Sequence, residues 1–287
     1  MTFLLVPNAQ RTDALHYTAH LAARLRQAGH RVVCIPAAVE PLRGIGFAAE
    51  SPDPQETPDM VMTLGGDGTL LRQMQLPALC EKPVWGVNFG HLGYLTDCEP
   101  AEADAAVTRL LAGEYTIEQR TVLAGEITDA DGAVRERFVA ANEANLCRGA
   151  MARALHMELS VNGSFVRSLS ADGIIVATPT GSTAYNFSAG GPILLPTMDC
   201  FVITAVCPYA ALDCSIVTSG SDEIAVRVRL PVADPDSPPL LVADGTVHFV
   251  LHDGDVVRLR RAAQRLQLVR TRNQNFYDRL QKKLSQL

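Results

Sequence analysis

The spacing of apolar residues changes near residue 115, and this change limits the folds that the chain can adopt. Before it, strand-like segments alternate with helix-like segments, as in Phe3–Val6 followed by Asp13–Ala28. Such alternation is typical of a parallel sheet with flanking helices. After it, short alternating runs are separated by turn dipeptides such as Asn162-Gly163, which are hairpin signals. The sequence therefore predicts an α/β N-terminal domain followed by a mainly β C-terminal domain.

The boundaries of the expected elements follow from the same periodicities. The first part predicts strands, helices and one loop in the order Phe3–Val6, Asp13–Ala28 ended by Gly29, Arg31–Ile35, Pro52–Pro58, Asp59–Leu64, Leu70–Leu79, Val84–Asn88 and Ala101–Leu111. The second part predicts hairpins at Asp131-Gly132, Asn162-Gly163, Asp244-Gly245 and Asp253-Gly254. The tail Asn275–Leu287 has helical spacing, and we expect this C-terminal helix to return to the first domain. The expected divisions are residues 1–118, 119–270 and 271–287.

The composition of the 287 residues indicates globular domains with substantial cores. The net charge of −6 does not favour non-specific binding to nucleic acid or to anionic membranes. No apolar stretch reaches the ~18 residues of a transmembrane helix, and the first residues lack the basic region of a signal peptide. The seven cysteines form no C-x-x-C pair, which argues against a zinc site or a disulfide framework. We therefore expect free thiols and a cytoplasmic location.

A polar loop follows the apolar run Gly173–Ala177. Its sequence over residues 178–192 is Thr-Pro-Thr-Gly-Ser-Thr-Ala-Tyr-Asn-Phe-Ser-Ala-Gly-Gly-Pro. Small residues let backbone N–H groups approach a ligand, and hydroxyl groups supply hydrogen-bond donors. The composition favours a loop that holds a polar, phosphate-bearing ligand, and the alternative is a long surface turn.

A second loop, Gly65-Gly66-Asp67-Gly68-Thr69, lies between a predicted strand and a predicted helix. Its glycines would let backbone N–H groups face a phosphate, and the helix N-terminus would add the positive end of its dipole. The loop lacks the Lys-Ser/Thr of a Walker A motif and the glycine spacing of a dinucleotide fingerprint. It therefore predicts a phosphate-binding turn of another kind.

Asp67 is unusual in such a turn, because a carboxylate repels phosphate. Two roles fit it: accepting a proton from an attacking hydroxyl group, or holding Mg²⁺ against phosphate oxygens. The alternative is an aspartate that supports the turn or caps the helix. Arg72, one turn later, would offer positive charge to the same phosphates unless it lies on a solvated helix face.

Together, these motifs resemble those of the NAD kinase family. The resemblance rests on Gly65–Thr69, Gly86–Asp97, Asn142-Glu143, Asp172-Gly173 and Thr178–Pro192, which occur in this order between about residue 60 and about residue 250. The long second loop is the more specific motif. Lipid kinases and phosphofructokinases carry turns similar to Gly65–Thr69.

The resemblance implies transfer of the γ-phosphoryl group of ATP, or of polyphosphate in some members, to the 2′-hydroxyl of the adenosine ribose of NAD, giving NADP. It implies that Asp67 is the general base and that Mg²⁺, ATP and NAD bind, with no protein residue assigned as a metal ligand. The residues that it implies for nucleotide binding are Gly66, Gly68, Thr69, Arg72, Asn142, Glu143, Arg153, Asp172, Thr183, Ala184, Tyr185, Asn186, Phe187 and Ser188. Family members suggest a homodimer or homotetramer, with the site between the two domains.

Some positions depart from the family's pattern or keep two interpretations. Pro208–Ser215 and Asp244-Gly245-Thr246 differ from it, so Tyr209 and Thr246 receive no site role. Tyr94 matches an aromatic residue near adenine, but it could equally be a core aromatic. Two alternative functions stay open: a lipid or sugar kinase of the wider Gly-Gly-Asp-Gly group, and a non-catalytic NAD(P) sensor.

Overall fold

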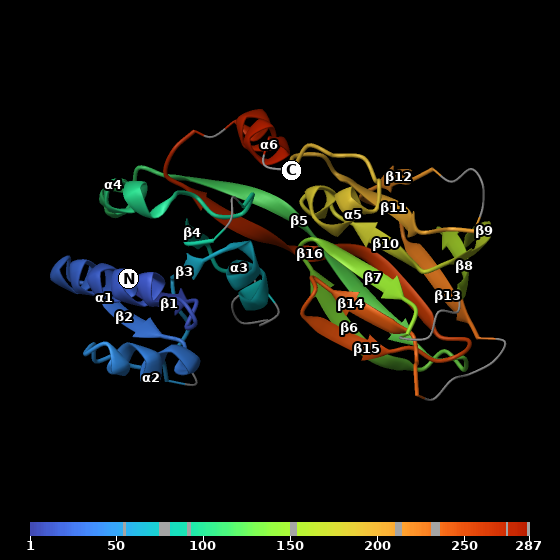
Figure 1. Ribbon diagram of the computed structural model, residues 1–287, viewed down its shortest axis with the longest axis horizontal. Helices are drawn as coiled ribbons and strands as arrows, with labels where there is room; N and C mark the ends of the chain where they lie inside the picture. The colour runs from blue at the N-terminus through green and yellow to red at the C-terminus, as the bar shows by residue number, and fades with distance from the viewer. Residues whose placement is uncertain are drawn as a thin grey trace. The chain divides into compact units, whose positions relative to one another are not determined.

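The computed structural model describes residues 1–53, 56–74, 81–90, 93–149, 154–209, 214–230, 236–273 and 275–285. The chain divides into two compact units. Unit 1 comprises Met1–Gln119 and Leu266–Leu287, and unit 2 comprises Arg120–Arg265. The predicted fold class is confirmed, because an α/β unit with parallel strands is followed by a β unit and a final helix (Figure 1).

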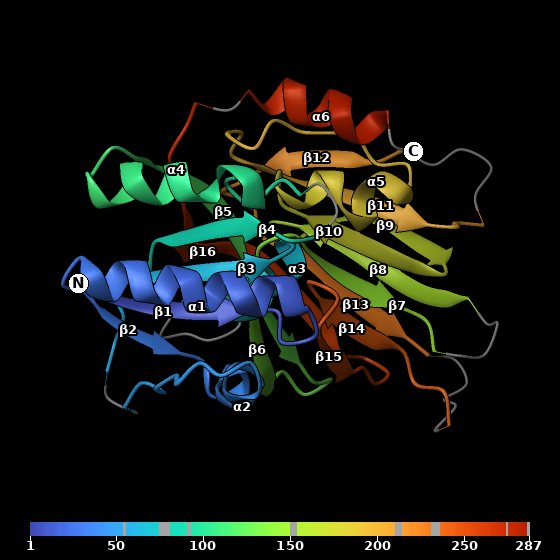
Figure 2. The ribbon, with the colours of Figure 1, turned by 60° about the vertical axis from the view of Figure 1, so that its left-hand side comes forward.

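Unit 1 is built on a parallel sheet with the strand order β2-β1-β3-β4, and the C-terminal end of β16 lies next to β4. Helix α1 packs along the sheet (Figure 2). The buried core includes Phe3, Leu21 and Trp85, each fully buried. The elements are β1 (Thr2–Pro7), α1 (Thr12–Gln27), β2 (Arg31–Cys34), α2 (Pro36–Gly44), β3 (Met60–Gly65), α3 (Asp67–Met74), β4 (Val84–Asn88), α4 (Pro100–Leu111) and α6 (Phe276–Leu284).

Two helices of unit 1 differ from the sequence-based expectation. Helix α2 was not expected, because Pro41 lies inside it and proline normally interrupts a helix. Helix α3 begins at Asp67, three residues before the expected start, so Asp67 belongs to its first turn. By contrast, Gly29 ends α1 as predicted: its φ is +81°, and its N–H donates to Arg26 O at 2.9 Å.

Unit 2 contains antiparallel strands of two sheets whose inner faces share one core. One sheet has the order β12-β11-β10-β7-β14-β15, and the other pairs β16, β13, β8 and β9 in that order, with β5 next to β16 and β6 next to β5. Leu146 and Phe201 from the first sheet and Val226 from the second are fully buried in this core. The elements are β5 (Thr116–Thr128), β6 (Val134–Ala140), β7 (Glu143–Cys147), β8 (Leu155–Val161), β9 (Ser164–Ala171), β10 (Gly173–Ala177), η1 (Gly181–Thr183), α5 (Tyr185–Ser188), β11 (Cys200–Val206), β12 (Ile216–Ser219), β13 (Ile224–Arg229), β14 (Leu240–Ala243), β15 (Val247–Val250) and β16 (Val256–Arg270).

The turn dipeptides of unit 2 follow the predictions with one exception. Asn162-Gly163 and Asp244-Gly245 have positive φ at both residues and join paired strands. The first dipeptide forms a two-residue hairpin loop, and the second begins the three-residue loop 244–246. The prediction of a hairpin at Asp253-Gly254 is wrong, because this turn joins β15 of one sheet to β16 of the other. It is fixed instead to β13, where Gly254 N donates to Val228 O at 3.0 Å, and Leu230 N, just after the strand, donates to Asp253 Oδ1 at 2.7 Å.

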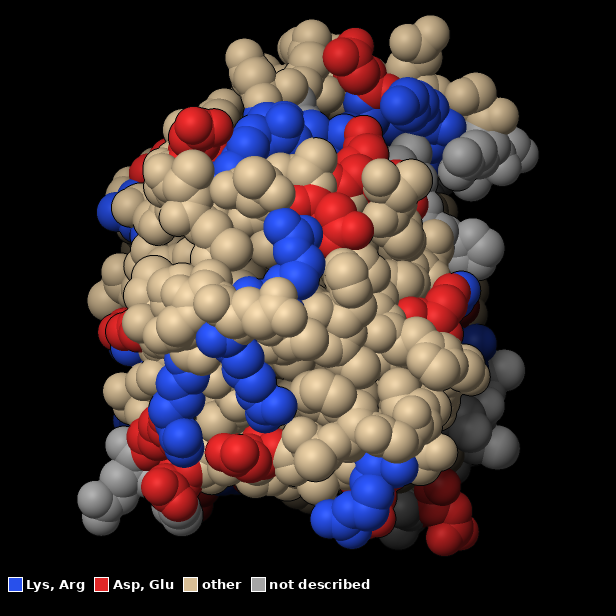
Figure 3. Space-filling view, turned by 90° about the vertical axis from the view of Figure 1, so that its left-hand side faces the viewer, with Lys and Arg blue, Asp and Glu red and all other residues tan. Residues whose placement is uncertain are grey.

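Charged groups of both signs are interspersed on the face shown in Figure 3. Arg24 Nη1 of α1 lies 2.9 Å from Asp104 Oδ1 of α4, and the aspartate side chain is 60% exposed. Such a solvated pair contributes about 1 kcal/mol or less to stability. Among the described residues, each helix is too short or too polar to traverse a bilayer.

Candidate active site

The first candidate region is the junction between β3 and α3 in unit 1. Strand β3 is buried along its whole length and ends at Gly65, and α3 starts two residues later at Asp67. The predicted loop is therefore a strand–helix junction, and Gly68 and Thr69 lie in the first helical turn. The first N–H groups of a helix lack intrahelical partners and carry its positive dipole end, so they suit an anionic ligand.

The glycines of this junction act through their small size. None of Gly65, Gly66 and Gly68 has a positive φ. A Cβ atom at Gly65 would overlap Thr69 Oγ1, so the close approach of α3 to β3 requires glycine there. At Gly66 and Gly68 no heavy atom lies within 4 Å of a Cβ position, and the backbone is open to an approaching group.

The Asp67 carboxylate is held by backbone amides of the segment Gly93–Thr96. Its Oδ2 accepts from Tyr94 N at 2.7 Å, and its Oδ1 accepts from Leu95 N at 3.1 Å and Thr96 N at 3.2 Å. A Cβ atom at Gly93 would overlap the carboxylate, so this approach needs glycine. Asp67 therefore does not cap its own helix, and its carboxylate is fixed in one orientation by a neighbouring segment.

The remaining predicted residues of this first region differ in exposure. Thr69 is 5% exposed, and its N–H donates to Gly66 O at 2.9 Å. Arg72 is exposed on α3, where its guanidinium is accessible to a ligand. Tyr94 is 7% exposed, and its ring lies 5.8 Å from that of Phe276 in α6, so it packs as a core aromatic.

The second candidate region is the loop of residues 178–192 in unit 2. Several of its hydroxyl groups bind backbone groups of the loop itself or of Ala141 beside it. Thr178 Oγ1 donates to Ala141 O at 2.5 Å, and Ser182 Oγ donates to Pro179 O at 2.6 Å. Asn186 is fully buried: its Nδ2 donates to Pro192 O at 3.1 Å and its Oδ1 accepts from Thr204 Oγ1 at 2.7 Å. These groups fix the shape of the loop.

Other side chains of the loop are accessible. Tyr185 is 43% exposed at the start of α5, so its ring offers a stacking face with a polar tip. Ser188 is also exposed, while Thr183, Ala184 and Phe187 are partly buried. The structure thus separates the predicted loop residues into Asn186, which holds the loop, and its neighbours, which can reach a ligand.

Asn142 and Glu143 lie beside this loop at the start of β7. Asn142 O accepts from Thr178 N at 2.8 Å, and the Tyr185 N–H faces the Glu143 carboxyl group. Asp244 holds the turn from the other side, because its Oδ1 accepts from Asn142 N at 2.8 Å and from Glu143 N at 3.2 Å. A Cβ atom at Gly181 would overlap the Asn142 backbone. The turn and the loop are therefore packed backbone to backbone.

Two buried carboxyl groups meet in this turn. Burial, and to a smaller extent the charge of the nearby Asp244, raise the pKa of Glu143 to about 8. Burial also raises the pKa of Asp244, to about 6, but three backbone N–H donors favour its charged form. Glu143 is therefore the carboxyl group that keeps its proton near pH 7. Its Oε2 has no hydrogen-bond partner among the described residues, so it can bind a hydroxyl or amide group of a ligand.

Asp172 follows β9 and is paired with a residue that the sequence analysis did not select. Arg148 Nε donates to Asp172 Oδ1 at 2.8 Å, and both side chains are partly exposed. The arginine neutralises the carboxylate and leaves its other oxygen able to accept from a ligand. The predicted residue Arg153 lies outside the described residues.

The sequence analysis missed three sets of residues that hold the predicted site residues in place. The Gly93–Thr96 amides hold Asp67, Asp244 builds the Asn142-Glu143 turn, and Arg148 pairs with Asp172. Gly93 lies within the motif Gly86–Asp97, but nothing in its local sequence indicates a contact with the carboxylate of Asp67, 26 positions earlier. The sequence analysis assigned Asp244 only to a hairpin turn, because an Asp-Gly dipeptide indicates local conformation and not contacts with distant residues.

Comparisons with known proteins agree over both units. The model of the ATP-NAD kinase N-terminal domain matches residues 50–115, and that of the ATP-NAD kinase C-terminal domain matches residues 141–271. The NAD kinase of Symbiobacterium thermophilum is 41% identical over 283 residues, which are 99% of this chain and 98% of the relative. The NAD kinase of Citrifermentans bemidjiense is 34% identical over 276 residues, covering 96% of this chain and 89% of the relative.

Two solved structures share the fold. Yeast NADH kinase complexed with NADH has a TM-score of 0.90 at 21% identity, covering 99% of this chain and 87% of that one. An NAD kinase from Archaeoglobus fulgidus in complex with ATP has a TM-score of 0.74 at 24% identity, covering 98% and 99% of the two chains.

The α/β unit with its strand–helix junction and the β unit with its polar loop define a nucleotide-dependent phosphotransferase. The chain belongs to the NAD kinase family, and it is an enzyme. The lipid or sugar kinase and the non-catalytic sensor are not favoured by these matches.

Proposed function

We propose that the chain transfers the γ-phosphoryl group of ATP to the 2′-hydroxyl of the adenosine ribose of NAD, giving NADP and ADP. The observation that carries this proposal is the Asp67 carboxylate, fixed by three backbone amides at the start of α3 beside an open glycine backbone. A fixed acceptor next to a phosphate-binding helix N-terminus suits a base in phosphoryl transfer.

In the proposed step, the 2′-hydroxyl oxygen attacks the γ-phosphorus in line, and its proton passes to Asp67. The bond between the γ-phosphorus and the oxygen bridging to the β-phosphate breaks, and ADP leaves with that oxygen. Positioning and charge neutralisation supply most of the rate, because the transition state is loose and the base need not be strong. The junction Gly66–Thr69 and Arg72 would bind the phosphates.

Unit 2 would bind the dinucleotide. Tyr185 offers a stacking face, while Asn142 and the neutral Glu143 offer donors and acceptors for base and ribose groups. Asp172, neutralised by Arg148, would accept from the carboxamide on the nicotinamide side. We therefore propose that residues 1–118 bind the phosphates and that residues 119–270 bind the dinucleotide. Residues 271–287 contain the C-terminal helix that we expect to return to the first domain.

We propose that Mg²⁺ enters with ATP as part of the substrate. The described residues contain no cluster of three His, Cys, Asp or Glu side chains suited to a metal ion. Both Asp67 oxygens already accept backbone N–H groups, which leaves them poorly suited as principal ligands. Mg²⁺ usually keeps several waters and is held by substrate phosphates with one or two carboxylates.

Chelation tests this assignment of Mg²⁺. The purified chain is expected to contain no stoichiometric Mg²⁺ by elemental analysis and to lose all activity in excess EDTA. Activity should return fully when Mg²⁺ is added with ATP, because no protein site needs rebuilding. A stoichiometric metal that survives dialysis would contradict the proposal.

The buried Glu143 predicts a pH-dependent stability. The folded chain keeps this proton up to a pKa of about 8, whereas the ordinary value is 4.5. The folded state therefore binds more protons between these pH values, so stability should fall as pH rises from 5 to 8. Glu143→Gln, which cannot titrate, should make the melting temperature depend less on pH over this range.

The matched control for this measurement is Glu136→Gln, which changes an exposed glutamate of the same unit. Its melting temperature should follow the wild-type pH dependence. Equal pH slopes for wild type and Glu143→Gln would show that Glu143 does not titrate between the folded and unfolded states as its burial requires.

A substrate panel tests the reaction against the lipid and sugar kinase alternatives. ADP release from ATP is measured with NAD, diacylglycerol or fructose 6-phosphate as the acceptor. We expect ADP release above the acceptor-free rate only with NAD, because the long loop of unit 2 presents groups suited to bases and ribose. Equal or faster release with the lipid or the sugar would overturn the proposal.

We also propose a cytoplasmic location and a homodimer or homotetramer. The six described cysteines are free thiols, which fits a reducing compartment. Phe165, on the edge strand β9, is 65% exposed, and Tyr209 is 71% exposed. Aromatic side chains are enriched in protein–protein interfaces, so these two are candidates for contact with another copy of the chain. Light scattering of the purified chain measures its mass, and a monomer at micromolar concentration would contradict the proposed assembly.

A further inference from the structure

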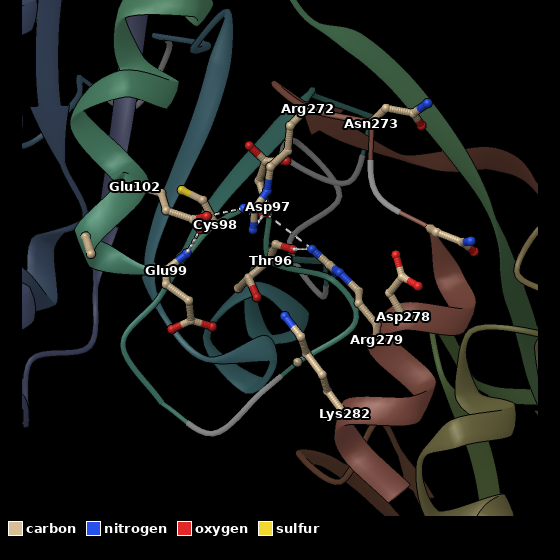
Figure 4. Close-up of a pocket in the computed structure, with 13 residues that line it drawn as sticks. Thr96, Asp97, Cys98, Glu99, Glu102, Arg272, Asn273, Asp278, Arg279 and Lys282 are labelled. Carbon is tan, nitrogen blue, oxygen red and sulfur yellow. Dashed lines mark hydrogen bonds and ion pairs between the residues drawn. The ribbon is translucent and has the colours of Figure 1, made fainter. Parts of the chain in front are cut away.

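Arg279 anchors the C-terminal helix to the segment that holds Asp67. Its guanidinium donates to Thr96 O at 2.7 Å, Tyr94 O at 2.8 Å and Asp97 O at 3.3 Å. Figure 4 shows this side chain extending from α6 toward Thr96. Burial, and to a smaller extent the charge of Arg270, lower its pKa to about 10, while the Asp67 charge acts in the opposite direction. Arg279 is therefore still charged at neutral pH.

A second arginine binds the same segment from β16. Arg270 is 8% exposed and donates to Leu95 O at 2.9 Å, Thr96 O at 3.0 Å and Tyr94 O at 3.2 Å. Its Nε also donates to Glu118 Oε2 at 2.7 Å, which fixes the guanidinium. Arg270 and Arg279 thus both donate to carbonyl oxygens of Tyr94–Thr96, and the N–H groups of the same residues donate to Asp67.

The peptide groups of this segment connect the arginines directly to the carboxylate. In the peptide group between Tyr94 and Leu95, the carbonyl oxygen accepts from both arginines and the N–H donates to Asp67. In the next peptide group, Leu95 O accepts from Arg270 and Thr96 N donates to Asp67. Hydrogen bonds in such chains polarise one another, so each guanidinium strengthens the amide that holds the carboxylate.

We propose that Arg279 is a positioning residue for Asp67, acting through the peptide groups of Tyr94–Thr96 without touching a reactant. This inference rests on the proposed function, in which Asp67 is the base. The C-terminal helix offers no fully buried side chain to the rest of unit 1, so its charged and aromatic contacts provide its attachment. Through Arg279, this surface helix fixes the orientation of the carboxylate on α3.

The test compares Arg279→Gln, Arg279→Lys and the control Lys282→Gln in the full chain. Lys282 lies one turn further along α6. Like Arg279, it lines the cavity of about 400 Å³ shown in Figure 4. Arg279→Gln should lower kcat by roughly 10- to 100-fold with KM for NAD and ATP within about threefold, because small displacements of a reacting group cost rate. Arg279→Lys keeps the charge but cannot span three carbonyl oxygens, so its kcat should lie between those of Arg279→Gln and wild type. Lys282→Gln should match wild type.

Each outcome bears on the proposal. A kcat within twofold of wild type for Arg279→Gln would overturn it, as would a rise in both KM values that accounts for the whole loss. If Arg279→Gln does not fold, Arg279→Lys decides, and an unchanged kcat at an unchanged melting temperature would overturn it. Asp67→Asn is measured in parallel: if that variant keeps its rate, the proposed base fails, whereas an inactive Asp67→Asn with a fully active Arg279→Gln rejects only the positioning role.

Discussion

Replacing Asp67 by asparagine is expected to lower kcat by roughly 10²- to 10⁴-fold, the range that general base catalysis contributes. The change removes the proton acceptor and leaves the open backbone at Gly66 and Gly68 unaltered. KM for NAD should stay within about threefold, because the proposed dinucleotide contacts lie on other residues. Steady-state kinetics with NAD and ATP varied separately measure both quantities.

Asparagine also changes the contacts with the Gly93–Thr96 segment, since its amide cannot accept at both positions. Circular dichroism and the melting temperature therefore accompany the kinetics. Asp13→Asn is the matched control, because Asp13 is an exposed aspartate in the first turn of α1. A folded Asp67→Asn variant whose kcat remains within tenfold of wild type would show that Asp67 is structural.

Replacing Gly181 by alanine is expected to impair the proposed dinucleotide-binding region of unit 2. The new Cβ atom would overlap the carbonyl group and Cα of Asn142, which are backbone atoms held in turn by Asp244. Such overpacking costs about 1–3 kcal/mol of stability. If about 1.4 kcal/mol of this is lost from NAD binding, KM for NAD rises about tenfold. Calorimetry gives the stability, and initial rates give KM.

Gly44→Ala is the matched control for this substitution. No heavy atom lies within 4 Å of its Cβ position, and its φ is ordinary for a non-glycine residue. It should leave KM for NAD unchanged, and the melting temperature should stay the same or rise slightly. If Gly181→Ala retains both wild-type stability and wild-type KM, the close packing of the long loop against Asn142 does not support the site.

The fold was predictable where local periodicity decides it. Strand β4 has the predicted boundaries, because Val84–Asn88 is a short apolar run between turns. Helix α2 was missed because Pro41 contradicts local propensity, while Leu42 is fully buried in the core. Asp253-Gly254 was misassigned because the dipeptide specifies a turn but not the strands that the turn connects.

The candidate site was predictable only in part, because motifs identify residue types and not their partners. Gly65–Thr69 pointed to Asp67, but the amides that hold it lie 27 to 29 positions later, and the arginines behind them more than 170 positions after those amides. Asn186 illustrates the converse. The motif predicts a ligand contact, whereas its side chain holds the loop together, and its role toward NAD stays a prediction.

Formation of NADP by the purified full chain tests the proposed reaction most directly. The chain is incubated with NAD, ATP and Mg²⁺, and NADP is measured with a dehydrogenase specific for it. We predict NADP in proportion to wild-type enzyme and time, with an equal amount of ADP, and a rate for Asp67→Asn of about 1% or less. Wild-type protein that forms no NADP above the enzyme-free blank would contradict the proposed function.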